Sequence, residues 1–239
     1  MPSGALKPEL RFKKINVTEA SMQKFWTPKK ESYFENTLAP ELAISSHIGL
    51  FTAIPQLDFL QTLVALAIEA DFQEMKIQEA LLQSYLFLGF PRTINALSAV
   101  EHLWKTPPQS FEAEVPREVF QKRGEMLCQK IYGENYSKLL HHMNTIHPDL
   151  KRYMIEEGYG KILSRDFLSP IAREFSILPQ LIVMNVPKQL HSHLLGALYL
   201  GASPNQIEAL FRHLSGPLEE TVLGPAKDLF RSIKEHRHV

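Results

Sequence analysis

The stretch QLHSHLLGALYLGASPNQIEAL, residues 189–210, decides the fold class that we predict for this chain. Its apolar side chains recur at spacings of three and four residues, which is typical of an α-helix. Ser203 followed by Pro204 matches a helix N-cap residue and the proline that is favoured in the first turn. The stretch therefore predicts two consecutive helices joined by a short turn.

The same helical spacing extends outward from this stretch over most of the chain, and the period-2 alternation of half-buried strands is missing. Gly89 and Gly133 follow such patterns at positions where glycine commonly ends a helix. We therefore expect an all-α protein. The segments with the clearest helical pattern are LQTLVALAIEA (60–70), KIQEALLQSYLFLG (76–89), TINALSAVEHLWK (93–105) and REVFQKRGEMLCQKIYG (117–133).

Composition narrows the class of partner and the cellular compartment. The 239 residues carry a formal net charge of zero, which gives no electrostatic footprint for nucleic acid or for an anionic membrane. The first residues, MPSGALKPELRFKK, lack the apolar core of a secretory signal. The lone cysteine, Cys128, cannot form an internal disulfide. We therefore expect a cytoplasmic protein that binds neither nucleic acid nor membranes.

The proline-rich segment KTPPQSFEAEVP separates two regions of helical pattern, because Pro107 and Pro108 forbid a continuing helix. Both regions run through an acid, an apolar helix, a turn and a second apolar helix, with Glu41 and Gln56 matching Glu174 and Gln189. Such self-similarity suggests a duplicated helical unit. The domain division that we expect is an N-terminal arm at 1–36, a first, degenerate repeat at 37–105, a linker at 106–116 and a second repeat at 117–239.

The second repeat contains, in order, the motifs RGEMLCQKIYGENY (123–136), MIEEGYGKILSRDFLSPIAREFSIL (154–178) and QLHSHLLGALYLGASPNQIEAL (189–210). The first repeat contains a similar helix ending, LLQSYLFLGFPRTINAL (81–97). In their order and spacing these motifs resemble the carboxymuconolactone decarboxylase family, which shares an all-helical fold with the alkylhydroperoxidase D proteins. The resemblance implies a tandem-duplicated chain with the alkylhydroperoxidase D-like fold, its two helical halves packed together, that assembles as a homo-oligomer.

The resemblance also implies a site in the second repeat. Counted back from Gly201, the family's histidine falls on His193 and its glutamate falls on Glu174. The peroxidase branch of the fold carries a C-x-x-C pair, whose positions hold Val186 and Gln189 here. Because thiol peroxidase chemistry needs a low-pKa thiolate, the resemblance places this chain nearer the decarboxylase branch.

The implied catalytic residues are Glu174 and His193 as a proton-transfer pair, with Gln189 and Arg173 as substrate-binding residues. Decarboxylation of an unsaturated lactone acid leaves a carbanion equivalent that must be stabilised and then protonated. That chemistry needs an acid and a hydrogen-bond donor in a dry pocket, so we expect no metal and no other cofactor. The function implied is that of a carboxymuconolactone decarboxylase-like lyase acting on a small carboxylated or lactone substrate.

Other interpretations of these site residues stay open. His193 can be a structural histidine, and Glu174 can be an acid in the first turns of a helix that pairs with Arg173. His191 and His193 are two positions apart, hence on roughly opposite faces of a helix, which disfavours a shared metal ion. The roles of several other residues also stay open, namely those of Cys128, His141, His142 and His147.

Two alternatives stay open for the whole chain. One is an alkylhydroperoxidase-like peroxidase, which the missing C-x-x-C pair disfavours. The other is a non-catalytic helical module for binding or assembly. The first repeat favours the module, because a leucine, Leu60 or Leu63, stands where the second repeat has His193.

Overall fold

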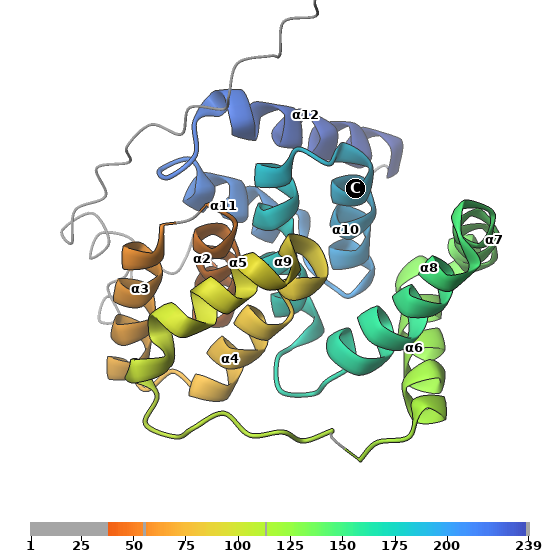
Figure 1. Cartoon of the computed structure of the whole chain (residues 1–239). Helices are drawn as coiled ribbons and strands as arrows, with labels where there is room; N and C mark the ends of the chain where they lie inside the picture. The colour runs from red at the N-terminus through yellow and green to blue at the C-terminus, as the bar shows by residue number, and fades with distance from the viewer. Residues whose placement is uncertain (1–37, 55, 113, 238–239) are drawn as a thin grey trace, which may run out of the picture.

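The structure is a computed structural model that describes residues 38–54, 56–112 and 114–237. Within these ranges the chain forms helices joined by turns and short irregular segments, and it forms no strand. The predicted all-α class is therefore confirmed (Figure 1). None of the helices in these ranges combines the length and the apolar content that crossing a bilayer needs.

The first group of helices occupies one side of the molecule and precedes the proline-rich segment in the sequence (Figure 1). Its members are α2 (Pro40–Ala53), α3 (Leu57–Glu69), α4 (Glu74–Leu82), α5 (Tyr85–Val100) and the 3₁₀ turn η2 (Glu101–Leu103).

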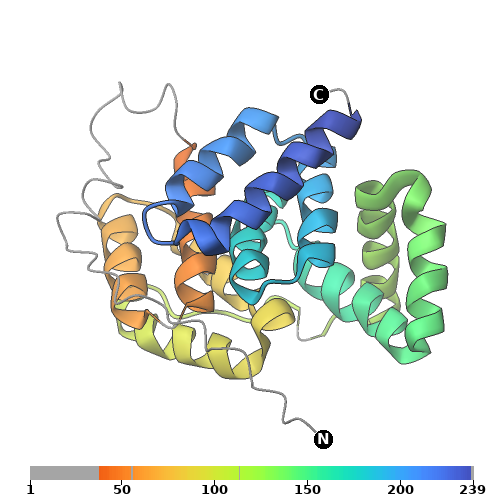
Figure 2. The same cartoon turned by 90° about the horizontal axis from the view of Figure 1, so that it is seen from above.

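The second group projects from the opposite side as a helical arm, which both views show (Figures 1 and 2). Two of its members, α7 and α8, bury no residue. The arm consists of α6 (Arg117–Tyr132), η3 (Gly133–Asn135), α7 (Tyr136–Ile146), α8 (Pro148–Tyr153) and the π-helix η4 (Met154–Leu163).

The third group returns to the body of the molecule. Its α9 lies near the centre, and its last two helices lie together along one face (Figure 2). The members are α9 (Pro170–Met184), α10 (Pro187–Tyr199), α11 (Pro204–Leu214) and α12 (Glu220–Arg237).

The core is centred on the contact between α2 and α9, which are buried over most of their lengths. Helices that are apolar on all sides are stable only when other helices cover them. Gly49 lets the two backbones approach, because a Cβ atom there would lie 1.9 Å from the carbonyl oxygen of Ser176. The contact between α2 and α9 therefore joins the first and third groups of helices through close backbone packing.

Helix starts recur at a constant interval in the first and third groups. Pro40 and Pro170 begin α2 and α9, and Leu57 and Pro187 begin α3 and α10, each pair 130 positions apart. With the same interval, Leu63 aligns with His193. Glu174 aligns with Ile44 and not with Glu41. The regular interval is what a duplicated unit would produce.

Several predicted helix ends are confirmed, and one is wrong. Ser203 caps α11 and forms a reciprocal capping box with Gln206. Gly133 ends α6 with a φ of 51°, which favours glycine. Gly89, with a φ of 75°, kinks α5 near its start instead of ending a helix.

Candidate functional site

The structure brings Glu174 and His193 together, although they come from different helices. Glu174 lies in α9 and His193 in α10, and His193 Nδ1 is 2.8 Å from Glu174 Oε2. Only 5% of the Glu174 side chain is exposed, against 12% of the His193 side chain. An ionised carboxylate can only accept hydrogen bonds, so with Glu174 ionised Nδ1 carries the hydrogen. A short polar contact therefore ties α9 to α10.

Apolar neighbours and a glycine enclose this contact. The ring of Phe87, from α5, meets the His193 ring edge to face with 5.3 Å between centroids. A Cβ atom on Gly196 would lie 3.3 Å from Ile131 Cγ2 and 3.4 Å from Glu174 Oε1. Glycine at this position of α10 therefore leaves the room in which the Glu174 carboxylate lies.

Two tyrosines and the cysteine of the arm lie near Glu174, whose charge acts on both tyrosines. The Tyr159 hydroxyl, from the π-helix, donates to the Tyr132 hydroxyl at 3.1 Å. Burial raises the pKa of both tyrosines, and the charge of Glu174 adds to the rise. Burial also raises the pKa of Cys128 to about 12. The Cys128 thiol therefore stays protonated at neutral pH and is a poor nucleophile.

Arg173 points away from this pair and into a buried polar network with α4. Its Nη2 donates to Glu79 Oε2 at 2.8 Å and its Nη1 donates to Gln83 Oε1 at 3.1 Å. Gln83 Nε2 returns a hydrogen bond to the Arg173 carbonyl at 3.1 Å. Burial lowers the pKa of Arg173, against the opposing effect of its hydrogen bond to Glu79. The predicted substrate-binding arginine thus has internal partners.

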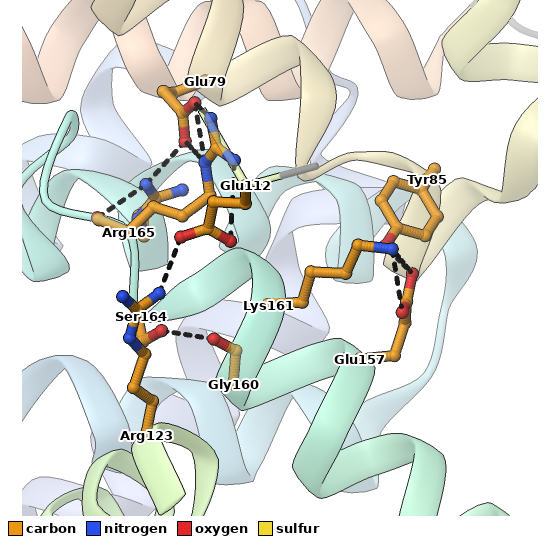
Figure 3. A network of polar contacts seen from close by, with 10 residues as sticks. Glu79, Tyr85, Glu112, Arg123, Glu157, Gly160, Lys161, Ser164 and Arg165 are labelled. Carbon is orange, nitrogen blue, oxygen red and sulfur yellow. Dashed lines mark hydrogen bonds and ion pairs between the residues drawn. The ribbon is translucent and has the colours of Figure 1, made fainter. Parts of the chain in front are cut away.

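Arg165 completes this network from the end of the arm (Figure 3). It donates from Nε to both carboxylate oxygens of Glu79 at 3.0 Å and from Nη2 to Oε1 at 2.7 Å. On its other side Glu112 accepts a hydrogen bond from Arg123 Nη1 at 2.7 Å. Sequence reasoning missed this network, because its ion pairs join residues 86 and 94 positions apart and leave no local pattern.

A separate polar contact joins α5 to the π-helix (Figure 3). The Tyr85 hydroxyl donates to Glu157 Oε1 at 2.5 Å, and Lys161 pairs with Glu157 Oε2 at 3.3 Å. Burial and this carboxylate raise the pKa of Tyr85. The contact therefore holds the arm against the first group of helices.

The remaining predicted site residue, Gln189, lies apart from these contacts. Its side chain is exposed at the start of α10, and His191 is also exposed. The structure therefore brings Glu174 and His193 together but leaves Gln189 and Arg173 elsewhere. Their proposed roles in substrate binding stay predictions.

Four hollows in the described part of the chain lie away from the Glu174–His193 contact. One lies between α11 and α12, one beside the start of α4, one along α4 and α5, and one between the arm and α10. Neither Glu174 nor His193 lines any of these four hollows. The hollow between the arm and α10 comes near the site, since Tyr132 lines it.

Comparison with known proteins finds two curated relatives, and no protein-family model matches the chain. A protein of Schizosaccharomyces pombe named Peroxisomal protein 2 is 34% identical over 135 residues, which cover 55% of this chain and 63% of that protein. A Saccharomyces cerevisiae protein of the same name is 27% identical over 165 residues, which cover 56% of this chain and 58% of that protein. The chain therefore spans less than two thirds of the length of either relative.

These names contradict several expectations drawn from the sequence. The expected membership in the carboxymuconolactone decarboxylase family is wrong, and so are the decarboxylase or lyase function and the peroxiredoxin relationship. The expected cytoplasmic location is also contradicted, since both relatives are named for the peroxisome. The resemblance rested on the order of apolar and small residues along helices, a pattern that any packed helical core requires.

Proposed function

We propose that this chain is a peroxisomal protein that acts as a non-catalytic helical module for binding. The names of its two curated relatives support the location. Because the alignment covers only part of each relative, the proposal concerns the segment that the proteins share.

The pairing of the buried polar groups supports a module more than an enzyme. Arg173 donates to Glu79 and Gln83, and Glu174 bonds to His193. A substrate-binding arginine needs terminal nitrogens that are available to the substrate, and both of those of Arg173 donate within the fold. The pairing of Arg173 with Glu79 and Gln83 is the observation that carries the proposal, since it gives a predicted substrate-binding residue a stabilising role within the fold.

The proposed module consists of two related units, at 37–105 and 117–239, joined by the linker at 106–116. The interval of 130 positions between corresponding helix starts supports this division. The buried contact between α2 and α9 gives each unit a partner surface for its most apolar helix. We propose in addition that the module binds a small molecule, forms a homo-oligomer, and has no nucleic-acid or membrane partner.

A second candidate function keeps Glu174 and His193 as a proton-transfer pair acting on an unspecified ligand, assisted by Gln189 and Arg173. The observation that favours it is the 2.8 Å contact together with the partial exposure of the His193 ring. Such a role does not depend on decarboxylase chemistry. It requires that a ligand reach the exposed edge of that imidazole.

Fluorescence microscopy in budding yeast tests the proposed location. The full chain is fused to a fluorescent protein at either end, in separate strains, and imaged beside a peroxisomal membrane marker. We expect punctate fluorescence that coincides with the marker and becomes diffuse in cells that lack peroxisomal import. Diffuse fluorescence from both fusions in normal cells would contradict the proposal.

A further inference from the structure

Residues 104–112, which we call the strap, run from the end of η2 toward α6 without forming a helix (Figure 1). Residues 105–111 of the strap are exposed. Thr106 is followed by Pro107 and Pro108. A residue before proline favours extended backbone, and consecutive prolines keep the chain extended beyond it. The strap therefore presents Thr106 on an open, extended segment.

Polar contacts hold the strap to the rest of the molecule near its start and at its end. The backbone N–H groups of Lys105 and Thr106 donate to Glu74 Oε2 at 3.1 Å and 3.3 Å. At the other end, Glu112 accepts a hydrogen bond from Arg123 Nη1 at 2.7 Å. Between these contacts, the backbone of residues 107–111 forms no hydrogen bond with the described part of the chain. Glu74 is therefore the polar anchor of the first half of the strap.

Three pairs of serine or threonine followed by proline lie in residues 38–54, 56–112 and 114–237, and only Thr106 is outside a helix start. Ser169 and Ser203 are the N-caps of α9 and α11, and each hydroxyl accepts a hydrogen bond from its own helix. A kinase would have to unwind a capped first turn to reach either serine. The Thr106 hydroxyl forms no hydrogen bond within these ranges, and no helix follows Pro108 before α6. Thr106 is therefore accessible without unfolding a helix.

We propose that Thr106 is a phosphorylation site for a protein kinase that recognises threonine followed by proline. The Thr106 hydroxyl oxygen attacks the γ-phosphorus of ATP. A new oxygen–phosphorus bond forms while the bond between the γ-phosphorus and the bridging oxygen breaks, ADP leaves, and a base of the kinase takes the hydroxyl proton. This site goes beyond the proposed function and does not depend on the proposed location.

The charge of the surrounding residues determines what the phosphate does. Thr106 lines a hollow beside the start of α4 whose titratable lining residues are Asp71, Glu74 and Lys105, two acids and one base. A phosphate adds about two further negative charges at neutral pH, and beside carboxylates it disrupts contacts by repulsion. Phosphorylation therefore weakens the Glu74 anchor and frees the first half of the strap from α4.

Release of the strap also changes the hollows beside it. Pro107 and Gln109 line both the hollow at the start of α4 and the larger hollow along α4 and α5. These two strap residues therefore form part of the wall of each hollow. When they move away from α4, both hollows become more open to solvent.

A kinase reaction tests the site. The full chain carrying Thr27→Val, which removes the threonine–proline pair outside the described residues, is incubated with a purified mitogen-activated protein kinase and ATP. Mass spectrometry of its peptides then locates the phosphate. We expect phosphate at Thr106 and none at Ser169 or Ser203. No phosphate at Thr106, or equal phosphate at the two serines, would overturn the proposal.

Hydrogen exchange tests the effect on the strap. We expect phosphorylation to speed exchange of the Lys105 and Thr106 amides at least about threefold, because each loses its hydrogen bond to Glu74. Slower exchange would mean that the phosphate docks at the start of α4, and unchanged exchange would mean that the anchor holds. Either result would overturn the proposed release.

Two variants serve as matched controls for the exchange experiment. Thr106→Val cannot accept phosphate, so kinase treatment should leave its strap amides unchanged. Glu74→Gln removes the charge that repels the phosphate but keeps an acceptor oxygen, so phosphorylation should speed exchange less than in the natural chain. An equal increase in Glu74→Gln would contradict repulsion by Glu74 as the cause.

Discussion

At the scale of single residues, the contact between Glu174 and His193 determines how α9 meets α10. A carboxylate that is almost wholly buried costs free energy unless a partner compensates it. His193 supplies that partner at 2.8 Å, and Gly196 leaves the space for the carboxylate. The pair therefore stabilises the fold whether or not it also serves a ligand.

A double-mutant cycle measures this stabilisation. We expect His193→Ala to lower the free energy of unfolding by about 3 kcal/mol, because it leaves a buried carboxylate without its partner. Glu174→Gln in the same background should cost at least about 1 kcal/mol less than it does in the natural chain. Urea unfolding of the four proteins gives both values. Strictly additive effects would mean that the two side chains do not interact.

A second residue-scale prediction concerns acid stability. Burial, with the nearby charges of His47 and Arg212, lowers the pKa of His213 to about 4, and burial lowers the pKa of His47 as well. The unfolded chain therefore binds protons below about pH 6.5 that the folded chain does not bind. Stability should fall as the pH drops from about 6.5 to about 4, with each group contributing at most about 1.4 kcal/mol per pH unit.

His213→Gln checks this assignment. Because His213 is partly exposed, solvent screening makes its share smaller than that upper limit. The variant should lose less stability than the natural chain between pH 6.5 and pH 4.5 in denaturant titrations. An unchanged loss would assign the acid sensitivity to other groups.

The residues of the candidate site were only partly predictable. His193 and Glu174 follow from the family resemblance by counting back from Gly201 across two motifs, and they lie within hydrogen-bond distance. The internal partner of Arg173 was not predictable, because Glu79 lies 94 positions away. Long-range ion pairs depend on how helices pack, and periodicity describes only which face of a helix is buried.

At the scale of helices, the close approach of α2 and α9 depends on Gly49. The close approach of the arm elements α6 and η4 likewise depends on a glycine. A Cβ atom on Gly160 would lie 1.9 Å from the Phe120 carbonyl oxygen. Small residues at such crossings let backbones touch, and a larger side chain forces the helices apart.

Substituting two glycines tests this packing. Gly49→Ala should lower the free energy of unfolding by about 2 kcal/mol or more, because the new methyl group meets the Ser176 backbone, which cannot move without shifting α9. Gly158→Ala is the matched control, because nothing lies within 4 Å of a Cβ atom at that position. The control should keep or gain stability, since alanine favours helices. Equal effects in thermal unfolding would contradict the packing account.

The presence of the helices and several of their ends could be predicted from the sequence. The π-helical hydrogen bonding of η4 and the kink in α5 could not. Ser203 with Pro204, and Gly133, carry local chemistry that specifies an end, and both predictions are confirmed. The π-helix η4 was not predicted, because it differs from an α-helix only in the hydrogen-bond step of the backbone. The kink at Gly89 was also missed, since a glycine with positive φ suits both a helix end and a sharp bend.

At the scale of the whole molecule, the helices of the first and third groups form a body around the buried pair α2 and α9. The second group projects from this body as the arm (Figures 1 and 2). The all-α class followed from the helical spacing of the apolar residues, because that spacing reflects which side chains are buried and can be read directly from the sequence. Family and location did not follow from it, since many unrelated helical proteins share the same spacing. The names of the two relatives contradict the expected family and location, and they are the basis of the location proposed above.

Protease protection on intact organelles tests most directly the central proposal, that the protein is peroxisomal and is imported into the organelle. Peroxisomes are isolated from yeast expressing the full chain and are treated with protease with and without detergent. We predict that the chain is recovered with the organelles and is degraded only after detergent opens them. Recovery of the chain in the soluble fraction, or degradation on intact peroxisomes, would contradict the claim.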